Sequence, residues 1–307
     1  MILTSIYIAF GDFMTFDSTK YTGLPHGYLD YHYILMHFEE EDIAKKASKI
    51  QSLFSKQTKK WTDQLNSEWI ARNYLSAKFI LSTNLLASSL DYSIDRNLQT
   101  VVPYLSYYSI LTASRSYLMT LPNVSWNDGS ILTYTHDKTI KIVSDSLRTI
   151  NKEIADDFQE KVYYLKAIRE LFSYKFPSTG IDCVTNKSMI GLNDTLNYCG
   201  LLCELAQLNS EFLEASFNKN AEKRRFPIIE EIFWGIMQYE DRPSQISFVD
   251  DFDWERIAQW TRTERPVNLT LSMREGWIDD FFASWEEGSH SDNDDFIPNP
   301  RIVFSVP

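Results

Sequence analysis

The spacing of apolar residues changes near Glu39. Before this point, "ILTSIYIAF" (Ile2–Phe10) is rich in β-branched and aromatic residues and predicts a strand. "RIVFSVP" (Arg301–Pro307) has the same character and predicts a second strand, which would bring the termini together if the two strands pair. Gly11–Gly27 is typical of a loop, and "YLDYHYILMHF" (Tyr28–Phe38) fits a strand or a helix equally.

From Glu39 onward the apolar residues recur every three to four positions, which predicts amphipathic helices. Pro103 fits the first turn of one helix, and Thr135 fits the N-cap of another that begins at His136. Further helices are expected over Ala155–Phe176, Gly191–Phe217, Ile228–Tyr239 and Trp254–Thr261. The expected stripes are Ile43, Ala47, Ile50 and Phe54; Ile70, Tyr74, Ala77, Leu81 and Leu85; Tyr104, Tyr108, Leu111, Arg115 and Leu118; and Phe158, Val162, Leu165, Phe172 and Phe176.

The fold class that follows is mainly α, a helical bundle with a small β element from the N- and C-terminal segments. The bundle is expected over residues 39–240, preceded by a strand and loop segment, 1–38, and followed by an acidic region, 241–307. A chain of 307 residues that is 44% apolar is long enough to bury a substantial core.

Charge is concentrated near the C-terminus. The formal net charge is −12, and residues 240–307 carry 15 Asp and Glu against 6 Arg. This balance disfavours a general nucleic-acid-binding surface, which needs clustered Lys and Arg, and favours a protein partner with a basic surface. The expected contact residues are Glu286, Glu287, Asp292, Asp294 and Asp295.

The cysteines and the N-terminus indicate a reduced, cytoplasmic protein. Cys183, Cys199 and Cys203 are too few for a disulfide framework, and the five histidines are not at metal-ligand spacing from them, so we expect free thiols, no metal and no cofactor. The apolar N-terminal stretch is too short to cross a bilayer and lacks the features of a signal peptide.

Two arginines, Arg115 and Arg169, interrupt apolar stripes. A guanidinium there must be paired or solvated, because an isolated buried charge is unfavourable. One interpretation is structural: a buried ion pair, with Asp145 or Glu170 for example, or an arginine that reaches outward from the core rim. The other is a phosphate or nucleotide site in a groove shared by the helices, whose candidate residues are Arg115, His136, Arg169, Tyr174 and Lys175.

The segment Pro103–Gly180 resembles the helical core of HEPN proteins, a superfamily named for nucleotide binding in prokaryotes and higher eukaryotes. The residues that carry the resemblance are "VPYLSYYSILTASRSYLMTLP", "THDKTIKIV" and "YYLKAIRELFSYKFPSTG". It implies an α-bundle, often dimeric, with RNA or nucleotide ligands and roles in prokaryotic toxin–antitoxin or antiviral defence systems.

Catalytic HEPN proteins cleave RNA with an arginine and a following histidine that are separated by four to six residues. Arg169 matches the arginine, but Tyr174, Lys175 and Phe176 follow it and no histidine does. We therefore expect a non-catalytic or divergent HEPN-like protein that binds a protein, RNA or nucleotide partner. Two alternatives stay open: a divergent RNA-cleaving enzyme that uses Arg169 and His136, and an acidic interaction protein without a nucleic-acid ligand.

Overall fold

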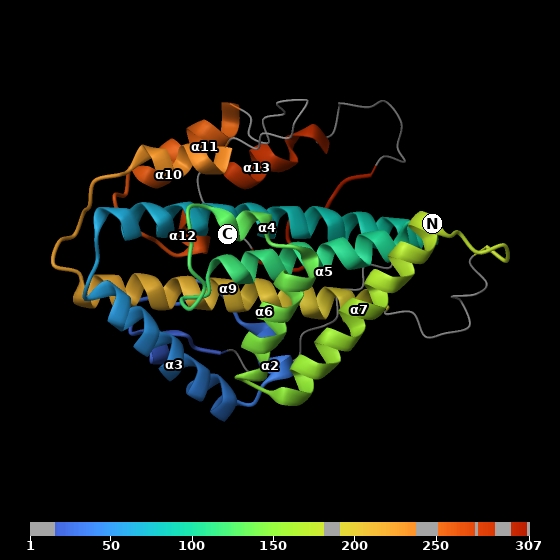
Figure 1. The fold of residues 1–307 in the computed structure, drawn as a ribbon, viewed down its shortest axis with the longest axis horizontal. Coiled ribbons are helices and arrows are strands. Elements are labelled where there is room, and N and C mark those ends of the chain that lie inside the picture. The colour runs from blue at the N-terminus through green and yellow to red at the C-terminus, as the bar shows by residue number, and fades with distance from the viewer. Residues whose placement is uncertain (1–15, 181–190, 238–250, 274–275, 286–295, 306–307) are drawn as a thin grey trace.

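The computed structural model of the protein describes residues 16–180, 191–237, 251–273, 276–285 and 296–305, and it is mainly α-helical (Figure 1). The long helices are α3 (Glu40–Thr58), α4 (Asp63–Asp95), α5 (Val102–Met119), α6 (His136–Arg148), α7 (Lys152–Tyr174) and α9 (Leu192–Asn220). Shorter helices are α1 (Thr19–Thr22), α2 (His32–His37), α10 (Glu230–Met237), α11 (Asp251–Thr261), α12 (Leu269–Ser272) and α13 (Trp277–Phe282), with 3₁₀ turns η1 (Ser130–Thr133) and η2 (Ala283–Trp285).

Three helices, α4, α5 and α9, run along the long axis and form the centre of the bundle (Figure 1). The 33 residues of α4 span about 50 Å. Nine consecutive residues of α4, from Trp69 to Ala77, are all buried, so this helix has no solvent-facing side there. A helix buried around its whole circumference belongs in the middle of a core, which explains why α4 lacks a clear polar face.

Helices α6 and α7 form a hairpin against one side of α5. The Thr135 hydroxyl accepts a hydrogen bond from the Lys138 N–H and begins α6, which confirms the predicted cap. The Asn151 side chain accepts bonds from the N–H groups of Glu153 and Ile154 and begins α7. These caps fix where the two helices start and therefore which of their side chains face α5.

The helices of the C-terminal part pack on α4. Helices α10, α11 and α13 lie along its outer side in Figure 1, and α11 and α12 contact it. Ile257, Trp260 and Leu269 belong to the same hydrophobic core as the central helices. The core therefore continues from α3 into the C-terminal part of the chain.

Two predictions about local structure are wrong. The part of the expected C-terminal strand that the structure describes, residues 301–305, forms turns, in which the Val303 N–H donates to the Asn84 side chain of α4. Ile2–Phe10 lies outside the described residues, within which there is no strand. Phe176, expected in the core, is 56% exposed, because α7 ends at Tyr174.

Polar side chains inside the core hold helix ends. Glu204 of α9 accepts bonds from the N–H groups of His32 and Ile34 in the first turn of α2, both at 2.8 Å. The Arg72 guanidinium of α4 donates to the carbonyl oxygens of Met119, Leu121 and Val124 at and beyond the end of α5. Buried backbone groups at helix ends need such partners, so these residues are structural.

Gly200 allows α2 to lie close against α9. A Cβ atom added at Gly200 would overlap the Tyr33 ring. We expect Gly200→Ala to lower the free energy of unfolding, although alanine favours a helix by about 1 kcal/mol over glycine. Urea unfolding measures this, and the double variant Tyr33→Ala, Gly200→Ala should lose less than the two single changes added together. Equal stability of Gly200→Ala and the original chain would contradict the close approach.

Candidate functional site

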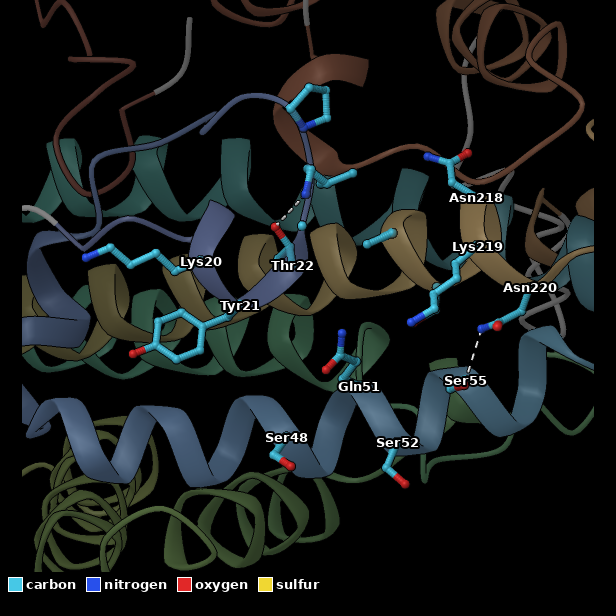
Figure 2. Close-up of a pocket in the computed structure, with 15 residues that line it drawn as sticks. Lys20, Tyr21, Thr22, Ser48, Gln51, Ser52, Ser55, Asn218, Lys219 and Asn220 are labelled. Carbon is cyan, nitrogen blue, oxygen red and sulfur yellow. Dashed lines mark hydrogen bonds between the residues drawn. The ribbon is translucent and has the colours of Figure 1, made fainter.

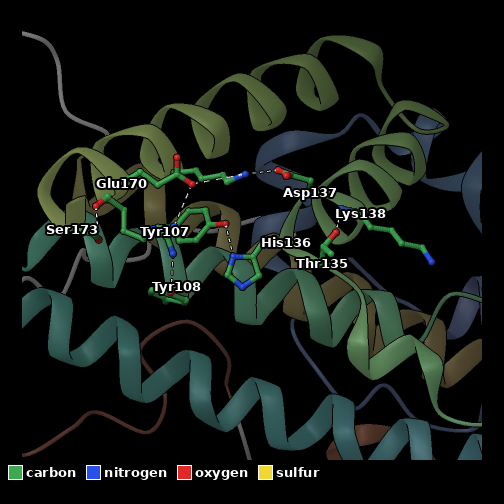
Figure 3. A network of polar contacts seen from close by, with 10 residues as sticks. Tyr107, Tyr108, Thr135, His136, Asp137, Lys138, Glu170 and Ser173 are labelled. Carbon is green, nitrogen blue, oxygen red and sulfur yellow. Dashed lines mark hydrogen bonds and ion pairs between the residues drawn. The ribbon is translucent and has the colours of Figure 1, made fainter. Parts of the chain in front are cut away.

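Three helices bring polar and charged side chains together where α6 begins against α5 and α7 (Figure 3). Tyr104, Tyr108 and Arg115 lie on one face of α5, because they are spaced four and seven residues apart. Lys166 and Arg169 are neighbours on α7, and His136 is the first residue of α6. We call Arg115, His136, Lys166 and Arg169 the α5–α7 cluster.

Arg169 joins α7 to α5. Its Nη1 donates to the Tyr108 hydroxyl at 2.8 Å, and its Nη2 lies 3.3 Å from a Glu170 carboxylate oxygen. The guanidinium carbon also lies 5.1 Å from the ring centre of Tyr107 and 5.6 Å from that of Tyr108, within the range of cation–π contact. The side chain is only 12% exposed, and its buried Nε has no hydrogen-bond partner within the described residues.

His136 faces the same tyrosine pair. Its Nδ1 lies 3.0 Å from the hydroxyl oxygen of Tyr107, and its ring meets that of Tyr108 edge to face. Burial, followed by the positive charges of Arg115, Arg169 and Lys166, lowers the pKa of His136 below its usual value. The imidazole is therefore mainly neutral at pH 7.

Arg115 lies half-buried on α5, beside Tyr107 and Tyr108. Burial lowers the pKa of this guanidinium, and the two tyrosines oppose the shift. Within the described part of the chain, the Arg115 side chain has neither a hydrogen bond nor an ion pair. The expected structural partner Asp145 instead pairs with Arg148 at 2.9 Å.

The cluster carries a small positive excess. Lys166 pairs with Asp137 at 2.7 Å and lies 4.0 Å from Glu170. The cluster and its neighbours therefore contain three cations, Arg115, Lys166 and Arg169, and two carboxylates, Asp137 and Glu170. Both carboxylates are about half exposed. Burial is the main cause of the lowered pKa of His136, and the three cations lower it further. Such an arrangement can attract and hold an anion although the chain as a whole is acidic.

The other predicted site residues either are exposed at the end of α7 or lie outside the described residues. Tyr174 is 79% exposed and Lys175 is exposed, one turn beyond Arg169 at the end of α7. The five acidic residues predicted to meet a partner, at positions 286, 287, 292, 294 and 295, lie outside the described residues. Cys199 and Cys203 are buried and free, as expected, and Cys183 lies outside the described part.

Three residues of the network were missing from the sequence prediction. Tyr107 and Tyr108 carry the contacts of His136 and Arg169, and Lys166 precedes Arg169 by one turn. Tyr108 lies in the same predicted stripe as Arg115, and Lys166 is three residues before Arg169, so both could have been found from helical spacing alone. Tyr107 is fully buried and its partner comes from another helix, so spacing along α5 could not identify it.

Among the helices in the described ranges, none is long and apolar enough to cross a membrane. The same ranges hold no group of three or more His, Cys, Asp or Glu side chains arranged to bind a metal ion. Comparison of the chain with protein-family models, curated proteins and solved structures finds no match.

Proposed function

We propose that the protein binds the phosphate groups of RNA or of a nucleotide through the α5–α7 cluster, and that it does so without cleaving them. The observation that carries the proposal is Arg115, a half-buried cation without a hydrogen bond or ion pair within the described residues. A charge in that position is unfavourable unless it meets an anion or water, so its donors are available to a ligand. The adjacent Arg169 Nε is a second buried donor without a partner in those residues.

The geometry suits phosphate recognition. Guanidinium groups present several donors in one plane and bind phosphate oxygens through two bonds at once. The N-terminus of α6 adds backbone N–H groups and the positive end of the helix dipole beside His136. The resemblance to HEPN proteins, which implies the same class of ligand and a role in prokaryotic defence, stays a prediction, since the comparisons give no match that bears on it.

Binding without cleavage follows from the proton chemistry of the cluster. Cleavage of RNA by its 2′-hydroxyl needs one group to accept a proton and another to donate one near neutral pH. His136 fits the first role, because its lowered pKa leaves it neutral. The adjacent Tyr107 does not fit the second, since burial raises its pKa to about 12.

The variant that tests the proposal is Arg115→Met. Because Arg115 has no protein partner in the described residues, its loss should leave the unfolding midpoint unchanged or raised, whereas RNA affinity should fall about tenfold or more. Fluorescence anisotropy of a labelled single-stranded RNA measures the affinity. Lys141→Ala, which removes an exposed charge from α6, is the matched control. The slope of log affinity against log salt should decrease by about one for Arg115→Met.

A loss of stability without a loss of RNA affinity in Arg115→Met would show that Arg115 is structural. The cleavage alternative is tested on the same RNA with the original chain, Arg169→Ala and His136→Ala. We expect no cleavage by any of them. Cleavage by the original chain that disappears in His136→Ala would instead establish a divergent nuclease in which His136, from a neighbouring helix, acts with Arg169.

A further inference from the structure

A second polar site lies between α1, α3 and the end of α9, away from the residues of the α5–α7 cluster. It is a cleft of about 790 Å³, a volume typical of small-molecule sites (Figure 2). Three parts of the chain line it: the segment Lys20–Pro25, one face of α3, and the end of α9. The lining residues of α9 are Ala215, Ser216, Asn218, Lys219 and Asn220. We call it the α3–α9 cleft.

The α3 wall consists of uncharged polar side chains, most of them serines. Gln51, Ser52 and Ser55 lie three, four and seven residues after Ser48, so the four side chains share one face of the helix. An exposed helix face normally carries long charged side chains, as α3 does at Lys45, where that side chain lies near Glu41 and Asp42. The serines leave room for a ligand and present hydroxyl groups to it.

Several polar groups in the cleft are free to bind. The side chains of Lys20, Ser48, Gln51, Ser52 and Lys219 have no hydrogen bond or ion pair within the described ranges. Figure 2 shows Gln51 extending from α3 and Lys219 extending from α9 into the space between the two helices. At the far end, Asn220 is already bonded to the hydroxyls of Ser55 and Thr58 and closes the cleft there.

The cleft is positively charged in an acidic protein. Its lining includes Lys20 and Lys219 and no Asp or Glu. Two further cations lie beside it, because Arg224 donates to the Asn218 carbonyl oxygen and Arg265 donates to the Asn218 side chain. Two carboxylates lie near its rim. Glu40 accepts a bond from the Tyr21 hydroxyl at 3.3 Å, and the pKa of Asp17 is lowered mainly by the hydrogen bond from Thr19 and in part by the nearby charge of Lys20. The four cations still outnumber the carboxylates. The charges therefore favour a ligand with an anionic group.

We propose that the α3–α9 cleft binds a small phosphorylated carbohydrate. Serine hydroxyls and the Gln51 amide both donate and accept hydrogen bonds, which matches the hydroxyl groups of a sugar. Lys20 and Lys219 supply the charges for the phosphate. The Tyr21 ring, stacked on Phe16 at 5.1 Å, lines the same cleft and offers a flat apolar surface to the sugar ring.

Isothermal titration calorimetry tests the proposal with glucose 6-phosphate, fructose 1,6-bisphosphate, glucose, AMP and inorganic phosphate. We expect the sugar phosphates to bind more tightly than glucose or inorganic phosphate alone. Lys219→Ala should weaken sugar phosphate binding about tenfold, as should Lys20→Ala. Ser52→Leu should block it by filling the cleft. Lys56→Ala is the matched control, since it removes an exposed lysine from α3 that does not line the cleft.

Other outcomes would overturn the assignment. Binding of AMP or inorganic phosphate as tight as that of the sugar phosphates would show that the carbohydrate is not recognised. Binding of glucose as tight as glucose 6-phosphate would exclude the role of the lysines. If no probe binds, the cleft is not a site for a phosphorylated carbohydrate. If sugar phosphates bind equally well to Lys219→Ala and Ser52→Leu, they bind elsewhere on the protein. Sensitivity to Arg115→Met in place of Lys219→Ala would place the binding in the α5–α7 cluster.

Discussion

Arg72→Met is expected to abolish cooperative folding or to lower the free energy of unfolding by several kcal/mol. The Arg72 guanidinium is buried and donates to three carbonyl oxygens, of Met119 at 2.6 Å, Leu121 at 2.7 Å and Val124 at 2.8 Å. Hydrogen bonds from a charged group contribute about 1.5–3 kcal/mol each, and a buried carbonyl without a donor costs about 1–3 kcal/mol. Methionine fills a similar volume and supplies no donor.

The same contacts explain why the arginine tolerates burial. Burial lowers the pKa of Arg72 to about 9, so the group keeps its proton at neutral pH. Its guanidinium also lies over the Trp69 ring, 3.9 Å from the ring centre, which offsets part of the lost hydration. Carbonyl groups at the end of α5 and in the turns after it thus receive hydrogen bonds from one side chain of α4, which holds together two helices that contact each other extensively.

Chemical denaturation followed by circular dichroism measures the effect. Arg72→Lys should fall between the original chain and Arg72→Met, because an ammonium group cannot reach all three carbonyl oxygens in the same plane. Arg148→Ala is the control: Arg148 pairs with Asp145 and Asp156 at the surface, where water screens the charges and such pairs contribute little to stability. Equal losses in Arg72→Met and Arg148→Ala would show that the buried contacts do not stabilise the fold.

Arg72 also shows where prediction from the sequence stops. The helices after Glu39 and their apolar stripes follow from spacing alone, and Ile43, Ile70 and Phe158 are buried as expected. In α4, the apolar spacing predicts one stripe, from Ile70 to Leu85, which does not include Arg72. Because α4 is surrounded by other helices, the side that bears Arg72 is also core, and a single arginine there must bond to a distant segment. Only the tertiary arrangement shows which segment it is.

The same limit applies to the candidate site. Arg115 and Arg169 could be singled out because each breaks an apolar stripe, whereas their common neighbours Tyr107 and Tyr108 depend on how α5, α6 and α7 cross. The C-terminal strand was expected from β-branched composition. Residues 299–303 form some of their backbone hydrogen bonds with side chains of α4 instead. The Val303 N–H donates to Asn84, and the Ser88 hydroxyl bonds to the backbone of Asn299.

Glu204→Ala is the second substitution expected to be severely destabilising. Glu204 is 3% exposed and receives the N–H groups of His32 and Ile34, while the N-cap residue Tyr31 provides no side-chain cap for α2. Alanine would leave the buried N–H of Ile34 without its acceptor, at a cost of about 1–3 kcal/mol, and would also remove the acceptor of the part-buried N–H of His32. Urea unfolding should therefore show a loss of about 1–3 kcal/mol from Ile34 and a smaller further loss from His32. Glu222→Ala, at an exposed glutamate just beyond α9, should change little.

The same carboxyl group makes stability depend on pH. Burial raises the pKa of Glu204 from 4.5 to about 8, against the opposing effect of the backbone N–H groups. Between pH 4.5 and about 8, Glu204 is protonated in the folded chain and ionised in the unfolded chain. The contribution of Glu204 to the free energy of unfolding therefore decreases as the pH rises through this range. Its contribution is complete below pH 4.5 and lost above about 8.

Unfolding free energies measured at pH 6 and pH 9 test this sign. The original chain should be less stable at pH 9, and Glu204→Gln, which cannot titrate and keeps one acceptor oxygen for the N–H groups of α2, should show a smaller difference between the two pH values. Glu211, whose pKa is also raised by burial, remains in both proteins and contributes equally to both. The same pH dependence in the original chain and in Glu204→Gln would show that Glu204 is ionised throughout this range, held as a carboxylate by the N-terminus of α2.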